Sequence, residues 1–424
     1  MSIIALGLLL RLIFILVVPT YPETDFMWYH MRGVELAQGK GFLNSIYPYY
    51  IGQPGFPSAF RPIGYPGTLA FFYYFFGPSF WVGKSLNLFF SFIIMLFSYK
   101  IAKIFFGKKI ALLTLLLIAF SPLSISYTGI LCSEVIFSAV LVFSTYILFT
   151  KNNPLILGLL IGYLSLIRPI AIFLPIIYLI YTFIKNNRNL KEKLKYASLL
   201  AVAFAIVISP WLVRNYLVFG KPFFSTNGGY VFYVNNNDFA TGSWSDPFKY
   251  PNSPMLKYKR EAGFDEIGLH EEGKKLAQEW IMNNPKKFFK LAFLRIKNSY
   301  WSKLDDIMWA FTTGINTWHP ITSKAIFGEK ILYRIFNIFL FIYIALSLIP
   351  VLKKKHVGFH TFILFVFAYF NSMMFVLEGN PRYVFPLHPL YTIGIAVVVY
   401  TYFYKLKSIL SFKIIYCNEN SDNI

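Results

Sequence analysis

Several features that carry chemistry in other proteins are scarce or missing in this sequence. Only two of the 424 residues are cysteines, which excludes a Cys-rich metal site. No GxxxxGK[ST] phosphate loop is present, so hydrolysis of ATP or GTP is not expected. HExxH and GxSxG motifs are absent as well, which argues against a zinc protease of that type and against an α/β-hydrolase.

Charged residues are also scarce, and apolar residues dominate. The chain is 14% charged, 56% hydrophobic and 20% aromatic, whereas a soluble domain rarely exceeds about 50% apolar residues. Apolar runs of about 20 residues, the length of a bilayer crossing, recur along almost the whole chain. The sequence therefore predicts a multi-pass protein of the cell membrane. The first apolar run lacks a basic start and a small-x-small cleavage site before Tyr21, so we expect a retained span.

The net charge of +21 is explained by topology. Lys and Arg collect in cytoplasmic loops of membrane proteins, so no nucleic-acid partner is expected. Lys-rich segments occur at 100–109, 185–195, 353–355 and 405–413. If all four segments lie on the cytoplasmic side, both termini lie there too. An even number of spans then separates each segment from the next. The two cysteines, Cys132 and Cys417, then lie on opposite sides of the membrane, and no disulfide is expected.

This topology predicts an all-α polytopic protein with about ten transmembrane helices. The predicted spans are 2–18, 84–104, 109–127, 133–150, 153–168, 169–185, 196–213, 331–352, 359–377 and 384–404. The apolar piece 64–77 is too short to cross, and we interpret it as a juxtamembrane helix in a first outer loop, 19–83.

The predicted domains follow from these spans. They are an N-terminal transmembrane module 1–213, a mixed extracytoplasmic loop domain 214–330, C-terminal transmembrane helices 331–413 and a cytoplasmic tail 414–424.

Five carboxylates fall on the predicted outer side, at Glu23, Asp25, Glu35, Glu134 and Glu378. Carboxylates close to a membrane are costly and usually mark function or a buried pair. Asp25 lies a few residues beyond the first span, and Glu134 lies at the tip of a short outer turn, so we favour a functional role for both. For Glu23 and Glu378 a solvated loop position is an equally good interpretation.

Four arginines oppose the positive-inside tendency: Arg61, Arg168, Arg214 and Arg382. A guanidinium binds phosphate or carboxylate in a two-pronged geometry, which indicates an anionic ligand. The alternative for each is snorkelling to outer headgroups. Arg11, in the middle of the first span, is expected to face a polar bundle interior.

Several stretches together resemble the GT-C glycosyltransferases of the protein mannosyltransferase and aminoarabinose transferase kind (glycosyltransferase family 39 and its bacterial relatives). They are "DFMWYHMRGVELAQGKGF", "FRPIGYPGTLAFFYYFFG", "SPLSISYTGILCSEVIF", "GLLIGYLSLIRP", "PWLVRNYLVFGKPFFSTNGGYVFYVNNN" and "GNPRYVFPLHPL". The likeness extends over residues 1 to about 400, and it rests on their order and spacing.

The resemblance implies a GT-C fold and an enzyme that takes a sugar from a polyprenyl-phosphate carrier to an acceptor protein, lipid or glycan at the extracytoplasmic face. It places the catalytic carboxylate at Asp25, a second acidic residue at Glu134, and the basic residue that meets the carrier phosphate at Arg61. Relatives often have adjacent acidic residues at the first position, whereas here Glu23 precedes Asp25 by two residues.

In the mechanism that follows, Asp25 is the general base, and Arg168 or Arg382 joins Arg61 in pairing with the phosphate. Tyr29, Tyr65 and Tyr383 are candidates for stacking on sugar or lining a lipid groove, although a core position is the better interpretation of each. His30 is a candidate ligand or hydrogen-bond partner, with a structural role favoured.

We expect no cofactor. Some GT-C enzymes, notably oligosaccharyltransferases, need a metal, so a divalent cation bridging Asp25 and Glu134 to the phosphate is the alternative. Two other functions stay open. An envelope polysaccharide polymerase or ligase also has many spans and a large outer loop, and a transporter would have spans broken by Gly or Pro in matching halves.

Overall fold

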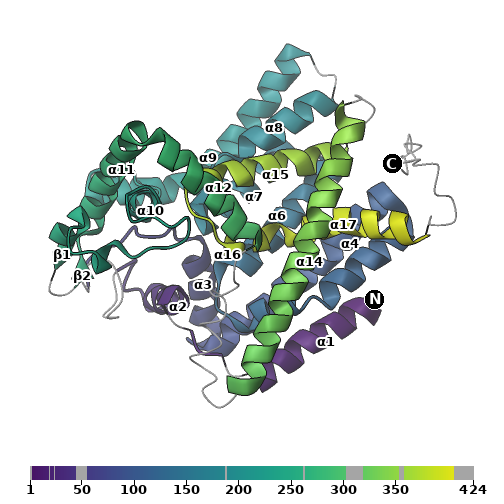
Figure 1. Cartoon of the computed structure of the whole chain (residues 1–424), viewed down its shortest axis with the longest axis horizontal. Helices are drawn as coiled ribbons and strands as arrows, with labels where there is room; N and C mark the ends of the chain where they lie inside the picture. Colours follow the sequence, from purple (N-terminus) through teal and green to yellow (C-terminus); the bar gives the residue numbers. More distant parts are fainter. Residues whose placement is uncertain are drawn as a thin grey trace.

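The computed structural model describes residues 2–18, 20–22, 24–43, 55–186, 189–260, 263–301, 319–352 and 358–404. Glu23, Cys417, the lysines of 353–355 and 405–413, and the tail 414–424 lie outside the described residues. Figure 1 shows a bundle of long helices with a lobe of shorter elements at one end of it.

The helices and strands follow the chain in this order. The N-terminal half contains α1 (Ser2–Val17), α2 (Thr24–Ala37), α3 (Gly64–Phe76), α4 (Phe80–Ala119), α5 (Pro122–Ser126), η1 (Tyr127–Gly129), α6 (Ser133–Thr150), α7 (Pro154–Ile167), η2 (Pro169–Ala171), α8 (Leu174–Lys185) and α9 (Leu190–Phe219). The lobe then contributes α10 (Asn227–Asn235), η3 (Pro247–Lys249), η4 (Pro254–Tyr258), β1 (Lys259–Arg260), β2 (Gly263–Phe264), α11 (Glu266–Asn283) and α12 (Pro285–Trp301). The C-terminal part contains α14 (His319–Leu352), α15 (Phe359–Val376), α16 (Pro381–Val384), η5 (Phe385–Leu387) and α17 (His388–Tyr404).

The all-α fold class is confirmed, and a helix occupies each of the ten predicted spans. Among the described residues, five helices are long and apolar enough to cross a membrane: Ser133–Thr150, Leu190–Phe219, Lys330–Ile349, Phe359–Val376 and Pro381–Tyr402. The apolar helices α1 and α7 and the stretch Pro169–Lys185 are shorter. The number of crossings therefore stays a prediction, and so do the domain boundaries.

The 40-residue helix α4 is a hairpin rather than one straight rod. Gly107 interrupts it with φ 77° and ψ 176°, a conformation that only glycine adopts without strain. A Cβ atom added to Gly7 of α1 would lie 3.0 Å from Met95 Sδ and 2.9 Å from Ala119 Cβ. In a straight helix those two residues would be about 36 Å apart. The chain therefore turns back at Gly107, as the two predicted spans 84–104 and 109–127 require.

The mid-span Arg11 is buried against the end of this hairpin. Its guanidinium donates to the carbonyls of Gly7, Ile118 and Ala119, each at 2.9 Å. The last carbonyls of a helix have no intrahelical partner and carry partial negative charge. Arg11 therefore satisfies the end of α4 and ties α1 to it.

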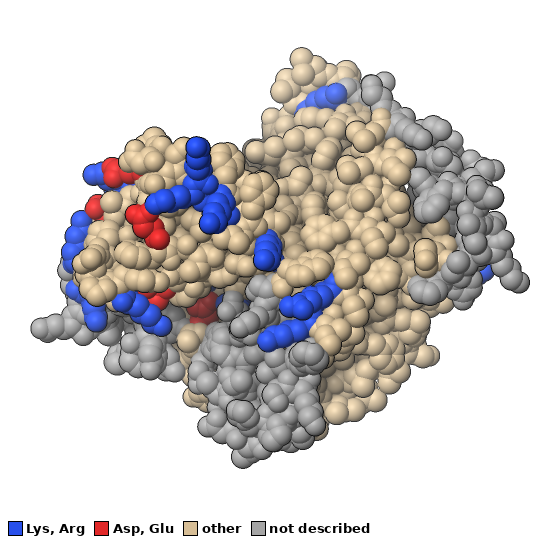
Figure 2. All heavy atoms as spheres, in the orientation of Figure 1, with Lys and Arg blue, Asp and Glu red and all other residues tan. Residues whose placement is uncertain are grey.

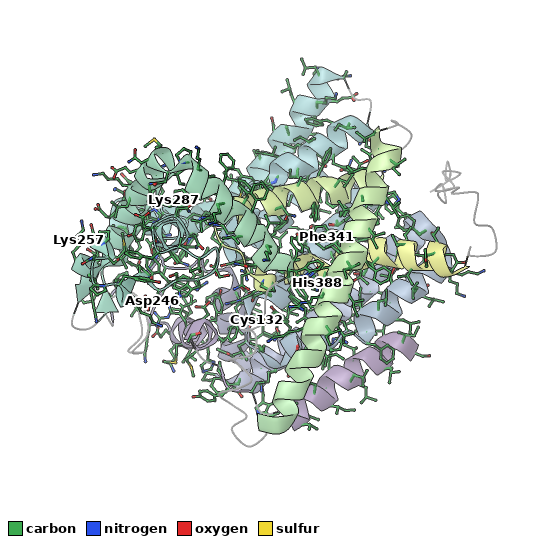
Figure 3. The ribbon with its side chains drawn as sticks, viewed as in Figure 1. Cys132, Asp246, Lys257, Lys287, Phe341 and His388 are labelled. Atoms are coloured by element: carbon green, nitrogen blue, oxygen red, sulfur yellow. The ribbon has the colours of Figure 1, made fainter. Side chains whose placement is uncertain are left out.

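The lobe is built on α10 and α11, which pack closely against each other in the left half of Figure 1. A Cβ on Gly229 would lie 1.9 Å from the carbonyl oxygen of His270, so only glycine fits this contact. β1 and β2 pair antiparallel, with Lys259 opposite Phe264. Figure 2 shows acidic and basic side chains together on the lobe, and a mostly uncharged surface over the bundle. Lys257 and Lys287 lie on the lobe, whereas the free thiol of Cys132 is buried inside (Figure 3).

Arg295 of α12 joins the lobe to the bundle. It is fully buried and donates to the carbonyls of Phe375 (2.7 Å), Val376 (3.3 Å) and Asn235, and to Asn236 Oδ1 (2.9 Å). One guanidinium thus holds together α12, the end of α10 and the C-terminal end of α15.

We predict that Arg295→Met lowers the free energy of unfolding by about 3 kcal/mol, because several buried acceptors lose their donor at once. Thermal unfolding in detergent, followed by tryptophan fluorescence, measures this. The matched control is Lys297→Met, an exposed position on the same helix, which we expect to leave the melting temperature unchanged. Equal melting of the two variants would contradict the role given to Arg295.

Candidate active site

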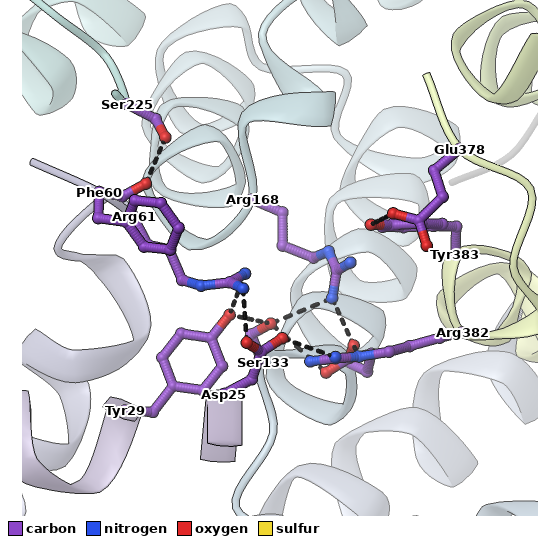
Figure 4. A network of polar contacts seen from close by, with 11 residues as sticks. Asp25, Tyr29, Phe60, Arg61, Ser133, Arg168, Ser225, Glu378, Arg382 and Tyr383 are labelled. Atoms are coloured by element: carbon purple, nitrogen blue, oxygen red, sulfur yellow. Dashed lines mark hydrogen bonds and ion pairs between the residues drawn. The ribbon is translucent and has the colours of Figure 1, made fainter. Parts of the chain in front are cut away.

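Five charged side chains from five separate segments meet at the end of the bundle that faces the lobe (Figure 4). They are Asp25 in the first turn of α2, Arg61 before α3, Glu134 in the first turn of α6, Arg168 after α7 and Arg382 in α16. Both carboxylates lie at helix N-termini, where the partial positive charge of the helix favours them.

Arg382 lies between the two carboxylates and contacts both. Its Nη1 is 2.9 Å from Asp25 Oδ2, and its Nε donates to Glu134 Oε1. Arg61 Nη2 is 2.7 Å from Asp25 Oδ1 on one side. Arg168 Nη1 is 2.6 Å from Glu134 Oε1 on the other. The network is therefore a row of three guanidinium groups held by two carboxylates, with one positive charge in excess.

The network is screened from water to different degrees. The side chain of Glu134 is fully buried, those of Arg168 and Arg382 are 12% exposed, and that of Asp25 is 23% exposed. Burial alone would raise the pKa of the Asp25 carboxyl, but Arg61 and Arg382 outweigh it and hold this pKa below its ordinary value. Asp25 is therefore ionised at neutral pH and is a hydrogen-bond acceptor.

The backbone is strained directly before Asp25. Thr24 has φ 42°, one of two non-glycine residues with positive φ among the described residues. Such a conformation costs of the order of 1–3 kcal/mol and persists where the surrounding structure imposes it. Here it turns the chain into α2 so that Asp25 enters the network.

The loop that carries Arg61 is fixed by residues from the lobe and from α9. Glu266, a buried residue of α11, accepts from Ser58 Oγ at 2.9 Å and from the Ala59 amide at 2.8 Å. Arg214 donates to the carbonyls of Ser58 (2.7 Å) and Phe42 (2.9 Å). Arg214 lies near the C-terminal end of α9, and in this structure it binds the chain itself.

The turn that carries Arg382 is fixed in a similar way. Asn380 caps α16, with its Oδ1 accepting from the Arg382 amide at 2.9 Å. The preceding Gly379 packs so closely on Arg295 that a Cβ would lie 2.2 Å from the Arg295 carbonyl oxygen. The contacts of α12 therefore set the position of Arg382.

Two of the four aromatic candidates lie within the network. Arg61 Nη1 is 3.4 Å from the Tyr29 hydroxyl, and its guanidinium lies over the Tyr29 ring. The Arg168 guanidinium lies 5.2 Å from the centre of the Tyr383 ring. Tyr65 lies behind Tyr29, in edge-to-face contact at 5.1 Å.

His30 lies outside the network. Its Nδ1 is 2.9 Å from the Tyr73 hydroxyl, and its ring packs on Phe80 at 4.4 Å. Burial lowers the pKa of His30 to about 4, so the ring is neutral at physiological pH. This environment is that of a packed structural histidine.

Sequence reasoning did not identify two residues that shape the site, and it left the role of a third undecided. Ser133 lies 3.1 Å from Arg168 Nη1, and Glu266 anchors the loop before Arg61. Glu378, which the sequence left open, accepts from the Tyr383 hydroxyl at 3.0 Å. Ser133 adjoins Glu134 in the chain and could have been inferred from that, whereas nothing in the sequence links Glu266 to a loop about 200 residues earlier.

Among the described residues, no cluster of three or more His, Cys, Asp or Glu side chains has the form of a metal site. The two carboxylates that could share a cation are separated by the Arg382 guanidinium, whose charge would oppose one there. The residues therefore do not fit a bridging cation in this arrangement.

Comparison with known proteins supports the resemblance predicted from the sequence. The family model described as dolichyl-phosphate-mannose-protein mannosyltransferase matches residues 61–213, less than half of the chain. No curated protein matches the sequence.

Two solved structures of the Archaeoglobus fulgidus oligosaccharyltransferase share the fold. The apo form has a TM-score of 0.54 at 13% identity, covering 96% of this chain and 51% of that one. The complex with Zn and sulfate has a TM-score of 0.53 at 13% identity, covering 95% and 49%. ArnT from Cupriavidus metallidurans bound to undecaprenyl phosphate aligns with a TM-score of 0.43 at 13% identity, over 94% of this chain and 78% of that one. The match to the oligosaccharyltransferase shows that the chain has the predicted GT-C fold, and the chain spans about half the length of that protein.

The buried neutral His30 predicts an acid-sensitive stability. Its folded-state pKa of about 4 lies below the ordinary 6.5, so the unfolded state binds the extra proton between these values. Stability therefore falls as the pH drops from 6.5 towards 4, by about 2 kcal/mol at pH 5. We expect His30→Gln to have a lower melting temperature than wild type at pH 8, where only the lost packing destabilises it. At pH 5 the wild type is also destabilised, so the difference in melting temperature should shrink. A deficit that is the same at both pH values would contradict the prediction.

Proposed function

We propose that this protein is a membrane glycosyltransferase that moves a sugar from a polyprenyl-phosphate carrier to an acceptor at the extracytoplasmic face. The observation that carries the proposal is the arginine–carboxylate network, with its excess of one positive charge. A sugar-linked lipid phosphate is a phosphodiester with one negative charge, which this excess matches. The family match over 61–213 and the shared fold support the same function.

Two of the arginines are placed to receive that phosphate. Arg61 and Arg168 line a cavity of about 230 Å³ that lies against the network, whereas Asp25 and Glu134 are not part of its lining. A phosphate entering this cavity would pair with both guanidinium groups. Such charge-assisted, two-pronged contacts are the usual way in which arginine binds phosphate.

Donor binding would also prepare the base. In the structure Asp25 is held by Arg61 and Arg382, and its lowered pKa makes it a weak proton acceptor. A phosphate that takes over part of the bonding of Arg61 removes part of that stabilisation. The pKa of Asp25 then rises, and the carboxylate becomes a better base for the acceptor hydroxyl.

The reaction would be a displacement at the anomeric carbon. The acceptor oxygen forms the new bond to that carbon as its proton passes to Asp25. The bond to the phosphate oxygen breaks, and its electron pair stays with the phosphate, whose charge grows by one. Arg61 and Arg168 stabilise that growing charge, which is usually the largest contribution to catalysis. Glu134 keeps Arg168 and Arg382 in position.

The proposal predicts that Asp25→Asn lowers transfer by about 10²–10⁴-fold, the usual contribution of a general base. The assay is glycosyl transfer by purified protein in detergent, from a panel of polyprenyl-phosphate sugars, with and without EDTA. We expect EDTA to leave the rate unchanged. Asp238→Asn removes an exposed carboxylate of the lobe, 63% exposed and paired with Lys287, and serves as the matched control.

Other outcomes assign the roles differently. Unimpaired transfer by Asp25→Asn would exclude it as the base and move the search to Glu134, through Glu134→Gln. Loss of transfer in EDTA would indicate a metal-dependent reaction. Transfer from no donor in the panel would contradict the proposal and make an envelope polysaccharide polymerase or ligase the function to test next.

A further inference from the structure

The cavity beside the arginines has a second wall that the proposed reaction does not use. This wall consists of Glu378, from the turn before α16, Tyr383 of α16 and Asn227, from the start of α10, which line the cavity together with Arg61 and Arg168. Figure 4 shows Glu378 and Tyr383 on the side of Arg168 away from Asp25.

This second wall is polar and screened from water. Glu378 is 6% exposed and accepts a hydrogen bond from the Tyr383 hydroxyl at 3.0 Å. The Asn227 Oδ1 atom is buried and has no hydrogen-bond partner within the described part of the chain. A buried polar atom without a partner costs about 1–3 kcal/mol. An unfilled acceptor here is explained if a ligand with hydroxyl groups supplies the donor.

The rest of the cavity is apolar. Its lining includes Ile170, Val231, Met373 and Leu377. The volume of about 230 Å³ is below the 300–1,000 Å³ of pockets that hold drug-sized ligands. The space therefore suits a single sugar ring better than a preassembled oligosaccharide.

We propose that this cavity holds one transferred monosaccharide and that Glu378 selects it. This rests on the proposed function, because the sugar reaches the cavity on the phosphate bound by Arg61 and Arg168. The Glu378 carboxylate and Asn227 Oδ1 accept hydrogen bonds from sugar hydroxyl groups, and the Tyr383 ring lies beside the sugar. A carboxylate in a buried wall also repels a second carboxylate, so a uronic acid is excluded while a neutral hexose is admitted.

Binding tests this inference separately from catalysis. The probes are a polyprenyl-phosphate hexose, the matching polyprenyl-phosphate uronic acid and the sugar-free polyprenyl phosphate, titrated against purified protein in detergent. We expect wild type to bind the hexose-linked carrier at least ten-fold tighter than the sugar-free carrier, and the uronic acid-linked carrier no tighter than the sugar-free one.

The variant Glu378→Gln keeps the size of the side chain and removes its charge. We expect it to lose at least ten-fold in affinity for the hexose-linked carrier and to bind the sugar-free carrier as wild type does. The difference in affinity between the hexose-linked and the uronic acid-linked carrier should become smaller. Tyr383→Phe, which removes the hydroxyl that orients Glu378, should show a smaller change in the same direction. Glu271→Gln, at a 47% exposed position of the lobe, is the control and should bind all three as wild type does.

The outcomes separate the two proposals. If Glu378→Gln leaves hexose binding and the hexose preference unchanged, the sugar site is elsewhere, whether or not the protein transfers sugar. If the variant instead raises KM for the acceptor while donor binding is unchanged, the cavity belongs to the acceptor, and this inference is wrong. If wild type shows the sugar-dependent binding but transfers from no donor, the inference stands and the catalytic proposal fails.

Discussion

The contact on which the site depends is the bridge that Arg382 makes between Asp25 and Glu134. These residues come from α16, α2 and α6, and Arg382 is 357 residues from Asp25 and 248 from Glu134 in the chain. Burying an ion pair costs several kcal/mol for each charge, and the attraction between the charges offsets this only when every member is in place. The network therefore requires that the ends of α2, α6 and α16 come together, and the packing of the helices must deliver them there.

That requirement explains why several residues around the site fix the backbone of the segments that carry the charged side chains. Glu266 and Arg214 hold the loop before Arg61, and the contacts of Arg295 and Gly379 hold the turn before Arg382. None of these four residues is part of the charge network. Glu266, Arg214 and Arg295 bind backbone groups that no helix pairs, and Gly379 allows the turn to pack closely on Arg295. These contacts fix the two segments that carry Arg61 and Arg382.

Much of this was predictable from charge and hydropathy. Outer arginines oppose the positive-inside tendency and carboxylates close to a membrane are costly, and these two criteria indicated Asp25, Glu134, Arg61, Arg168 and Arg382. The positive-inside tendency could not distinguish Arg214, which binds carbonyls of the chain, from the arginines of the network. It could not find Glu266 either, because a single acidic residue in a charged helix such as α11 has no distinguishing pattern. His30 is the opposite case, because its neighbours in the sequence suggest a functional site. Its packing on Tyr73 and Phe80 in the structure shows that the ring is structural.

Under the proposed function, the arginines and the polar wall of the cavity contribute differently to the recognition of a sugar phosphate. The arginines act through charge, which reaches far and attracts any lipid phosphate, so they supply affinity with little discrimination. Glu378 and Asn227 act through hydrogen bonds, which fail within a fraction of an ångström and so distinguish one sugar from another. Asn227 belongs to the lobe and Glu378 to the turn held by α12, whereas Asp25, Glu134 and Arg168 belong to the bundle and its adjoining helices. A substitution of the Asn227 side chain would therefore change which sugar the proposed site accepts, whereas a substitution of Glu266 in the same lobe would also displace the loop that carries Arg61.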